Sequence, residues 1–229
     1  MKVLALGAHP DDIEIFMFGT LAAYAAQGAE LTFAIATDGA RGGPGDPGQL
    51  ARVRREEATA AAALLGAIPR FLDFPDGALV ADAALIGALK ALITQTRPDL
   101  VITHAPYDYH GDHRALSDGM RIAASFAVPV LHADTLGGTG FLPTHYVDIS
   151  AQGDLKARAI RAHRSQDPDR FVAMARTQNL FRASQCNGAP EALAEAFRFE
   201  PSYPFADIRA LLPPAPPIIP VTVSTVKLM

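Results

Sequence analysis

The stretch LGAHPDDIEIF, residues 6–16, decides the fold of this chain because it joins a strand pattern to a helix pattern through a short polar turn. The apolar run at residues 3–6 has the length of a buried strand. Residues 13–27 are rich in alanine and other helix formers, and Gly28 follows where a helix is expected to end. A strand that passes directly into a helix is the first unit of an alternating α/β domain.

The same alternation continues along the chain. Short runs of β-branched and apolar residues predict further strands at 31–36, 71–74, 100–103, 128–132 and 146–149. Helices are predicted at 49–65, 82–96, 112–126, 154–165 and 168–183. Strands that alternate with helices imply right-handed crossovers. The sequence therefore predicts a single α/β domain with a mostly parallel sheet and helices on both faces.

Composition excludes several classes of protein. The chain has 229 residues, of which 49% are hydrophobic, enough to bury the core of one domain. Its net charge of −4 does not favour nucleic acid as a partner. No stretch approaches the roughly 20 apolar residues of a membrane span, and the apolar start of the chain stops at His9 with charged residues directly after it, unlike a signal peptide. The single cysteine, Cys186, excludes an intrachain disulfide and fits a reducing compartment, so we expect a soluble cytoplasmic protein.

Polar residues follow three of the predicted strands. Residues 9–12 follow the first strand, residues 37–45 follow the second, and residues 104–113 follow the strand at 100–103. Parallel sheets bind ligands outside the carboxyl ends of their strands. The three loops are therefore expected to converge on one crevice.

The first of these loops carries His9, Asp11 and Asp12. An aspartate directly before a helix commonly caps it, and either aspartate fits that role. Capping does not explain His9. Two adjacent carboxylates also repel each other, and each costs energy to desolvate. A bound cation removes both objections.

The loop after the strand at 100–103 completes a candidate metal site. Its sequence, HAPYDYHGDHRALSD at residues 104–118, is rich in histidine and aspartate. We assign His9, Asp12 and His113 as ligands of one metal ion per chain. Two imidazoles and one carboxylate leave coordination positions open, which is typical of a catalytic zinc, although Fe²⁺ or another divalent ion also fits.

Three neighbouring residues have chemical roles in this hypothesis. A water on such a metal loses a proton near neutral pH and becomes a nucleophile. Asp11, next to a ligand but free, would be the general base. His110 would donate a hydrogen bond or a proton to the oxyanion or the leaving amine. Asp112 would bind the other nitrogen of His110 and fix its orientation.

Taken together, the motifs resemble those of the PIG-L/LmbE-like zinc-dependent N-deacetylases. Residues 9–14 (HPDDIE) are similar to the first metal motif of that family, and residues 110–113 (HGDH) are similar to the second. The resemblance continues through RREEATAAAALLG at 54–66, KARAIRAHRSQ at 156–166 and EAF at 195–197.

The resemblance implies a Rossmann-like fold with a single zinc ion. It implies hydrolysis of an N-acetyl or other N-acyl group, usually on an amino sugar or glycoside, and it implies the same ligands, base and oxyanion histidine as the residues do. There are three departures from the family pattern. Ile13 separates Asp12 from the acid that usually follows it, Gly111 stands where proline is common, and no tyrosine matches one that assists in some members.

Three further residues are assigned to substrate binding. Arg54 lies in a predicted helix, where it either pairs with a nearby glutamate or points into the crevice to bind substrate. Asp76 follows the third strand, where a turn with Gly77 explains it equally well. Asp108 stands nearest to the position of the assisting tyrosine of the family.

Other functions fit the same residues. An amidase acting on a larger sugar conjugate is one alternative, and a non-haem iron enzyme with the same His/Asp/His triad is another. A sugar-binding module with an inactive site is a third. The expected partner is a small N-acylated amino sugar or glycoside.

The chain is predicted to contain a deacetylase-like domain over residues 1–200 and a proline-rich extension over residues 201–229. The prolines in PPAPPIIPVTVSTVKLM, residues 213–229, favour an extended conformation, and VTVSTV has strand propensity. We expect an ordered arm that pairs with a sheet edge of the same or a neighbouring subunit, which would make the protein a homo-oligomer in the second case.

Overall fold

The computed structural model describes residues 1–221, and its centre is a seven-stranded sheet in the order β3-β2-β1-β4-β5-β7-β6. The strands are β1 (Lys2–Gly7), β2 (Glu30–Thr37), β3 (Arg70–Phe74), β4 (Leu100–Thr103), β5 (Val130–Ala133), β6 (His145–Asp148) and β7 (Ala194–Phe199). The helices are α1 (Asp12–Phe16), α2 (Phe18–Ala26), α3 (Pro47–Ala63), α4 (Ala83–Thr96), α5 (Gly111–Ala123), α6 (Gly153–Arg161) and α7 (Pro168–Gln185). Strands β1 to β5 are parallel to one another, and β7 is antiparallel to β5 and β6. The prediction of one α/β domain with a mostly parallel sheet is confirmed.

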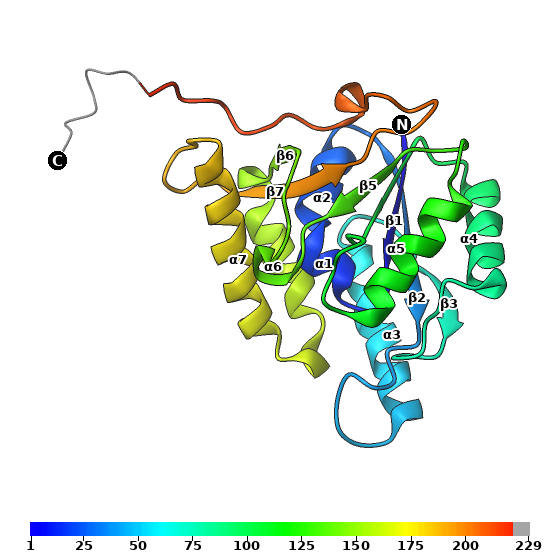
Figure 1. Cartoon of the computed structure of the whole chain (residues 1–229). Coiled ribbons are helices and arrows are strands. Elements are labelled where there is room, and N and C mark those ends of the chain that lie inside the picture. Colours follow the sequence, from blue (N-terminus) through cyan, green and yellow to red (C-terminus); the bar gives the residue numbers. More distant parts are fainter. Residues whose placement is uncertain (222–229) are drawn as a thin grey trace.

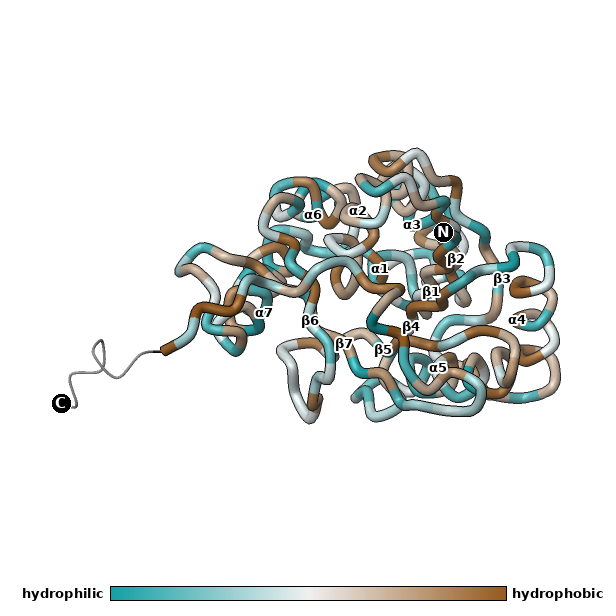
Figure 2. Tube along the Cα trace, turned by 90° about the horizontal axis from the view of Figure 1, so that it is seen from above, coloured by the Kyte–Doolittle hydropathy of each residue, from teal (hydrophilic) through white to brown (hydrophobic). Residues whose placement is uncertain are grey.

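Helices cover both faces of the sheet, and its central strands are therefore buried on both sides. In β1, Val3 and Ala5 face one apolar core, which α1, α2, α3, α6 and α7 complete. Leu4 and Leu6 face the other core, which α4 and α5 complete. Figure 2 shows the two layers on opposite sides of β1 and β4. A strand with consecutive apolar residues, such as residues 3–6 in β1, is typical of this arrangement.

The helix predicted over residues 13–27 is divided in two at Met17, so that prediction was wrong in this detail. Met17 has φ −143° and ψ 1°, which ends α1 and allows α2 to begin with its own set of free amides. The buried carboxylate of Glu195, in β7, accepts hydrogen bonds from the Gly19 and Thr20 amides at 2.9 and 2.8 Å. Lys156 of α6 pairs with the same carboxylate at 2.6 Å. The break therefore has a tertiary cause that the local sequence does not contain.

Strand β7 was not predicted. Its sequence AEAFRF contains two charged residues, Glu195 and Arg198, which does not resemble the apolar runs of the parallel strands. Glu195 is nevertheless buried, because Lys156 and the start of α2 neutralise it. A charged residue can occupy a buried strand position only when such partners exist.

Residues 201–221 continue beyond β7 along the body of the protein (Figure 1). The Tyr24 hydroxyl donates a hydrogen bond to the Leu211 carbonyl at 2.8 Å, and the Asp148 amide of β6 donates to the Pro214 carbonyl at 2.9 Å. Most of the strand-like VTVSTV stretch lies in residues 222–229, outside the described residues. Within residues 1–221, none of the helices combines the length and the apolar composition that a membrane span requires.

Candidate active site

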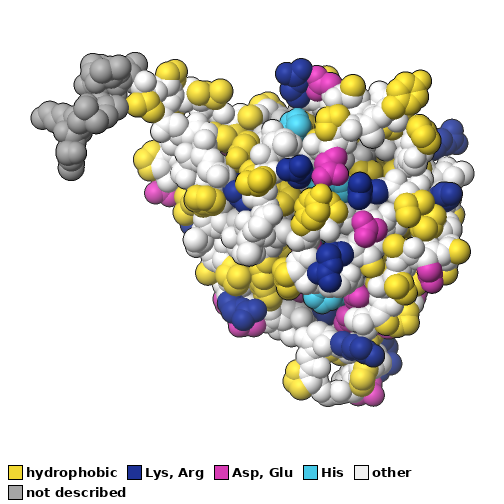
Figure 3. Space-filling view, viewed as in Figure 1, with side chains coloured by type: hydrophobic (Ala, Val, Ile, Leu, Met, Phe, Trp, Pro, Cys, Tyr) yellow, Lys and Arg dark blue, Asp and Glu magenta, His cyan; other side chains and the backbone are white. Residues whose placement is uncertain are grey.

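A cavity of about 290 Å³ lies at the carboxyl end of the parallel strands. Its walls come from the loops after β1, β2, β3, β4 and β5 and from the start of α7. In Figure 1, β1 runs downward from the N-terminus toward this end of the sheet. In Figure 3, which has the same view, histidine, acidic and basic side chains gather on the lower part of the molecule. The structure thus brings together the loops that the sequence analysis expected to converge.

Three buried side chains converge at the base of this cavity. His9 Nδ1 lies 3.3 Å from Asp12 Oδ2, and His113 Nε2 lies 3.3 Å from Asp12 Oδ1. The two ring nitrogens lie 3.2 Å from each other. Zinc in a tetrahedral site has nitrogen and oxygen ligands at about 2.0–2.1 Å, which places neighbouring ligand atoms about 3.3 Å apart. The two histidine nitrogens, each with one Asp12 oxygen beside it, therefore have distances that suit a zinc ion.

The protonation of the two histidines also suits a cation. His9 Nε2 lies 3.2 Å from Asp112 Oδ2 and 3.3 Å from Asp76 Oδ1, and His113 Nδ1 lies 3.1 Å from Asp108 Oδ2. Because these carboxylates can only accept, each histidine carries its proton on the nitrogen that faces them. The opposite nitrogens face one another and Asp12. This arrangement requires a cation among these atoms, either a proton or a metal ion.

The pKa values of these residues reflect the same excess of negative charge. Burial by itself lowers the pKa of His9, but its contacts with Asp112, Asp12 and Asp76 outweigh burial and raise the pKa to about 12. Burial raises the pKa of Asp12, but His113 and His104 outweigh burial and hold it well below its usual range. Asp12 is therefore ionised, as a metal ligand must be.

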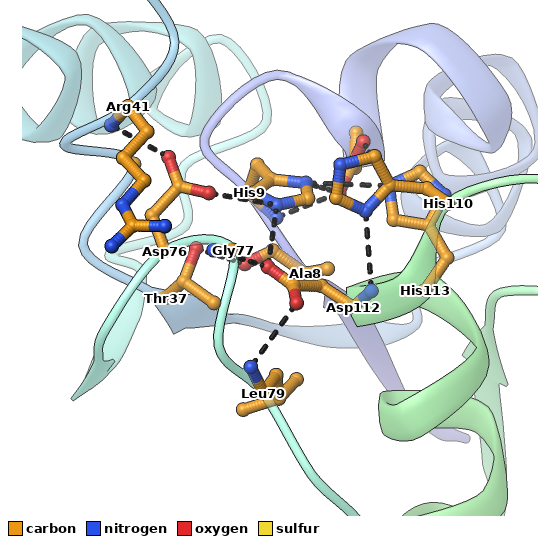
Figure 4. A network of polar contacts seen from close by, with 12 residues as sticks. Ala8, His9, Thr37, Arg41, Asp76, Gly77, Leu79, His110, Asp112 and His113 are labelled. Atoms are coloured by element: carbon orange, nitrogen blue, oxygen red, sulfur yellow. Dashed lines mark hydrogen bonds and ion pairs between the residues drawn. The ribbon is translucent and has the colours of Figure 1, made fainter.

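Asp112 and Asp108 lie behind the histidines and not in the cavity wall. The Asp112 carboxylate accepts hydrogen bonds from the Gly77 and Leu79 amides at 2.7 and 3.1 Å and faces His9 (Figure 4). The expected contact of this carboxylate with His110 is therefore wrong. His110 Nδ1 instead accepts a hydrogen bond from the Asp112 amide at 3.2 Å.

The position of Asp108 also differs from its expected role. Its Oδ1 accepts a hydrogen bond from the His110 amide at 2.9 Å, and its Oδ2 lies 3.1 Å from His113 Nδ1. The two oxygens of this buried carboxylate thus face His110 and His113. Asp108 orients a candidate ligand, and the substrate-binding assignment does not fit this placement.

Asp11 precedes α1, but its side chain makes no capping hydrogen bond. Its backbone has φ 116°, a strained conformation for a residue with a side chain. The carboxylate lies in the cavity wall, and its Oδ2 is 3.3 Å from Arg54 Nη2. Burial raises the pKa of Asp11 to about 6, although Arg54 opposes this increase. Helix capping does not account for this aspartate.

Arg54 is buried and joins two of the loops. Its guanidinium donates hydrogen bonds to the Pro10 carbonyl and, at 3.0 Å, to the Gly39 carbonyl. A Cβ atom on Gly42 would lie only 2.2 Å from Arg54 Nη1, so the glycine-rich loop leaves room for this side chain. The structure gives Arg54 an aspartate partner, Asp11, and not the glutamate partner considered above.

Comparison with known proteins identifies the family. The family model of the GlcNAc-PI de-N-acetylases, PIG-L, matches residues 4–124. The chain belongs to the PIG-L family. It is 32% identical to diacetylchitobiose deacetylase of Thermococcus kodakarensis over 189 residues. This match covers 73% of this chain and 71% of that protein. The solved structure of N,N′-diacetylchitobiose deacetylase from Pyrococcus horikoshii superimposes with a TM-score of 0.77 at 27% identity, covering 87% of this chain and 83% of that one.

Relatives of this PIG-L protein include an enzyme of another reaction class. The chain is 31% identical over 123 residues to 4-oxalmesaconate hydratase of Pseudomonas putida, which covers 49% of this chain and 47% of that protein. Most of the other similar proteins are named as deacetylases of acetylated sugars. Membership of the PIG-L family thus supports an enzyme and favours deacetylation.

Some residues of this PIG-L site were not assigned from the sequence. His104 is buried with its ring stacked on that of His113, with centroids 3.7 Å apart, and its Nε2 lies 3.1 Å from Asp12 Oδ2. Its place in a histidine-rich loop was the available signal. Leu136 and Phe171 also line the cavity. Nothing in the sequence around them signals a site, because both residues look like core residues.

Glu14, the acid displaced by Ile13 in the HPDDIE motif, does not line the cavity. It pairs with the buried His163 at 3.2 Å.

Proposed function

We propose that this protein is a zinc-dependent hydrolase that removes an N-acetyl or other N-acyl group from an amino sugar or glycoside. The observation that carries the proposal is the convergence of His9 Nδ1, His113 Nε2 and the Asp12 carboxylate beside Asp11 in one cavity. Such a set has open positions for water and substrate when it binds zinc. Similarity to deacetylases of acetylated sugars supports the choice of reaction.

His9, Asp12 and His113 would hold the zinc ion. Bound there, zinc would supply Lewis acidity, which lowers the pKa of a water and polarises the amide carbonyl. Asp112 and Asp108 face the outer nitrogens of His9 and His113 and would keep the protons there when the inner nitrogens bind zinc.

Asp11 is the proposed general base. It lies in the cavity wall next to the ligand Asp12, where it can accept the proton of the attacking water and pass it to the nitrogen of the scissile amide. The C–N bond then breaks to give a carboxylic acid and a free amine. Arg54 positions Asp11 by its ion pair and by holding the neighbouring Pro10 carbonyl.

His110 is proposed to stabilise the developing oxyanion. It lines the cavity and is only half-buried, with its ring 4.7 Å from that of His9. Asp76 and Arg41 line the cavity on the other side of His9 (Figure 4) and are proposed to bind substrate hydroxyls, Asp76 through the lone pairs that His9 and the Arg41 amide leave free. These polar groups suit a sugar, whose hydroxyls need hydrogen-bond partners when they are buried.

The test is an assay of metal content and product on one sample. We expect about one zinc per chain and release of acetate and amine, in equal amounts, from at least one member of a panel of N-acetylated sugars, glycosides and larger sugar conjugates. The His113→Ala variant is the control and should lose both zinc and activity. Water addition to an unsaturated acid without amine release would favour a hydratase, and oxygen uptake with bound iron would favour an iron enzyme.

A further inference from the structure

The cavity has a polar side and an apolar side, and the order of the strands in the sheet determines where each side lies. The candidate metal ligands follow the central strands β1 and β4. Arg41 and Asp76 follow β2 and β3, toward one edge of the sheet, and Leu136 follows β5, in the opposite direction. All three residues line the cavity. The reacting centre therefore lies between two chemically different walls.

The apolar side consists of four side chains. Leu136 and Phe171 are half-buried, and Ile15 and Phe16 of α1 are buried beside the ligand loop. Gln166 also lines the cavity, but a Cβ on Gly42 would lie 3.0 Å from its Oε1, which places it next to the loop after β2. Its amide thus belongs to the polar side.

The wall that contains Leu136 is held rigidly by α7. Gln178 accepts a hydrogen bond from the Gly137 amide and donates one to the Thr135 carbonyl, both at 2.9 Å. Arg182 makes two hydrogen bonds with the buried Asp134, at 2.6 and 3.0 Å. Side chains on two turns of one helix therefore fix both ends of the short segment that carries Leu136.

Gly138 is required in this loop because Arg182 leaves no room for a side chain there. Gly138 has φ +69°, and a Cβ atom there would lie 2.7 Å from Arg182 Nη2. The loop thus packs its backbone directly on the arginine that anchors it. Because the wall is anchored in this way, we expect the size of its side chains to limit what fits against it.

We propose that the acyl group of the substrate lies against Leu136 and Phe171, and that Leu136 limits the length of the acyl chain. This inference rests on the proposed amide hydrolysis. The two substituents of an amide leave its carbonyl carbon in different directions, so one extends to each side of the reacting centre. An acyl chain has no hydrogen-bonding atom beyond the carbonyl and suits the apolar side, whereas sugar hydroxyls suit Arg41 and Asp76.

The experiment measures kcat/KM for N-acetyl-, N-propionyl- and N-butyrylglucosamine with the zinc-loaded protein. Leu136→Ala should raise the butyryl-to-acetyl ratio of kcat/KM by about 10-fold or more, the discrimination expected for one or two methylenes in an apolar pocket. Leu136→Phe should lower the ratio. Leu142→Ala is the matched control, because Leu142 is 74% exposed and lies outside the cavity wall, and the ratio should not change.

The outcomes separate this inference from the proposed function. An equal loss of kcat/KM for all three substrates in Leu136→Ala, with normal zinc content, would overturn the acyl-side assignment and leave amide hydrolysis intact. An unchanged ratio in both Leu136 variants would do the same. No amine release by the wild-type protein from these three substrates or from any member of the wider panel would overturn the proposed function and this inference with it.

Discussion

At the scale of single residues, Asp11 and Asp12 are adjacent and chemically alike but occupy different environments. Asp12 faces both candidate histidine ligands, whereas Asp11 faces Arg54 and the cavity. Asp11→Asn should keep zinc and reduce turnover by about 10²–10⁴-fold, because the amide cannot accept a proton. Asp12→Asn should mainly weaken zinc binding. Zinc analysis and steady-state kinetics on both variants measure this, and near-normal turnover in Asp11→Asn would exclude it as the base.

The pH dependence of turnover tests the same residue. A general base acts only when ionised, so activity should fall as the pH drops through the pKa of Asp11. Burial raises that pKa to about 6 in the absence of metal, and a bound cation lowers it, so the acidic limb should lie below pH 6. The limb should disappear in Asp11→Asn. Persistence of the same limb in that variant would assign it to another group.

A variant of Asp112 tests whether its carboxylate acts on His9, as the structure shows, or on His110, as the sequence analysis expected. Its carboxylate holds His9, so Asp112→Asn should weaken zinc binding by about 10–100-fold, and added zinc should restore activity. Asp118→Asn, on the exposed face of the same helix, is the control. Isothermal titration with zinc measures the affinity. Lower turnover at unchanged zinc affinity would instead support an action of Asp112 on His110.

At the scale of secondary-structure elements, the buried pair of Lys156 and Glu195 joins α6, β7 and the start of α2. Lys156→Met should destabilise the protein by about 3–5 kcal/mol, because it leaves the Glu195 carboxylate buried without a cation. Urea denaturation of the variant measures this. Lys90→Met, at an exposed position of α4, should change stability by less than about 0.5 kcal/mol. A similarly small effect at Lys156 would show that the helix amides alone compensate Glu195.

At the scale of the whole molecule, the metal should stabilise the fold. At a zinc concentration about 1,000 times Kd, binding contributes about 4 kcal/mol. A chain of this length gains roughly 2–4 °C in Tm per kcal/mol, so a chelator should lower Tm by roughly 8–16 °C, and added zinc should reverse the change. Differential scanning calorimetry measures the shift. The Tm of His113→Ala should not respond to chelator, and an equal response of both proteins would place the bound metal elsewhere.

Local patterns made much of the fold predictable. The strand predicted at 100–103 agrees with β4, and the helix predicted at 82–96 agrees with α4, which Asp82 caps through the amides of Ala84 and Leu85. The break at Met17 and the strand β7 were missed because both depend on the partners of Glu195. The sequence places these partners about 39 and 175 residues away from it.

The sequence by itself determined the α/β alternation, the polar turns at the strand ends and the inventory of histidines and aspartates available as ligands. Those features follow from the composition and spacing of neighbouring residues. Only the tertiary structure decided that Asp112 holds His9 across 103 residues of sequence and that Leu136 faces the cavity. These contacts depend on which loops the sheet order brings together, and each of them fixes a distance or a proton position that spacing along the chain does not specify.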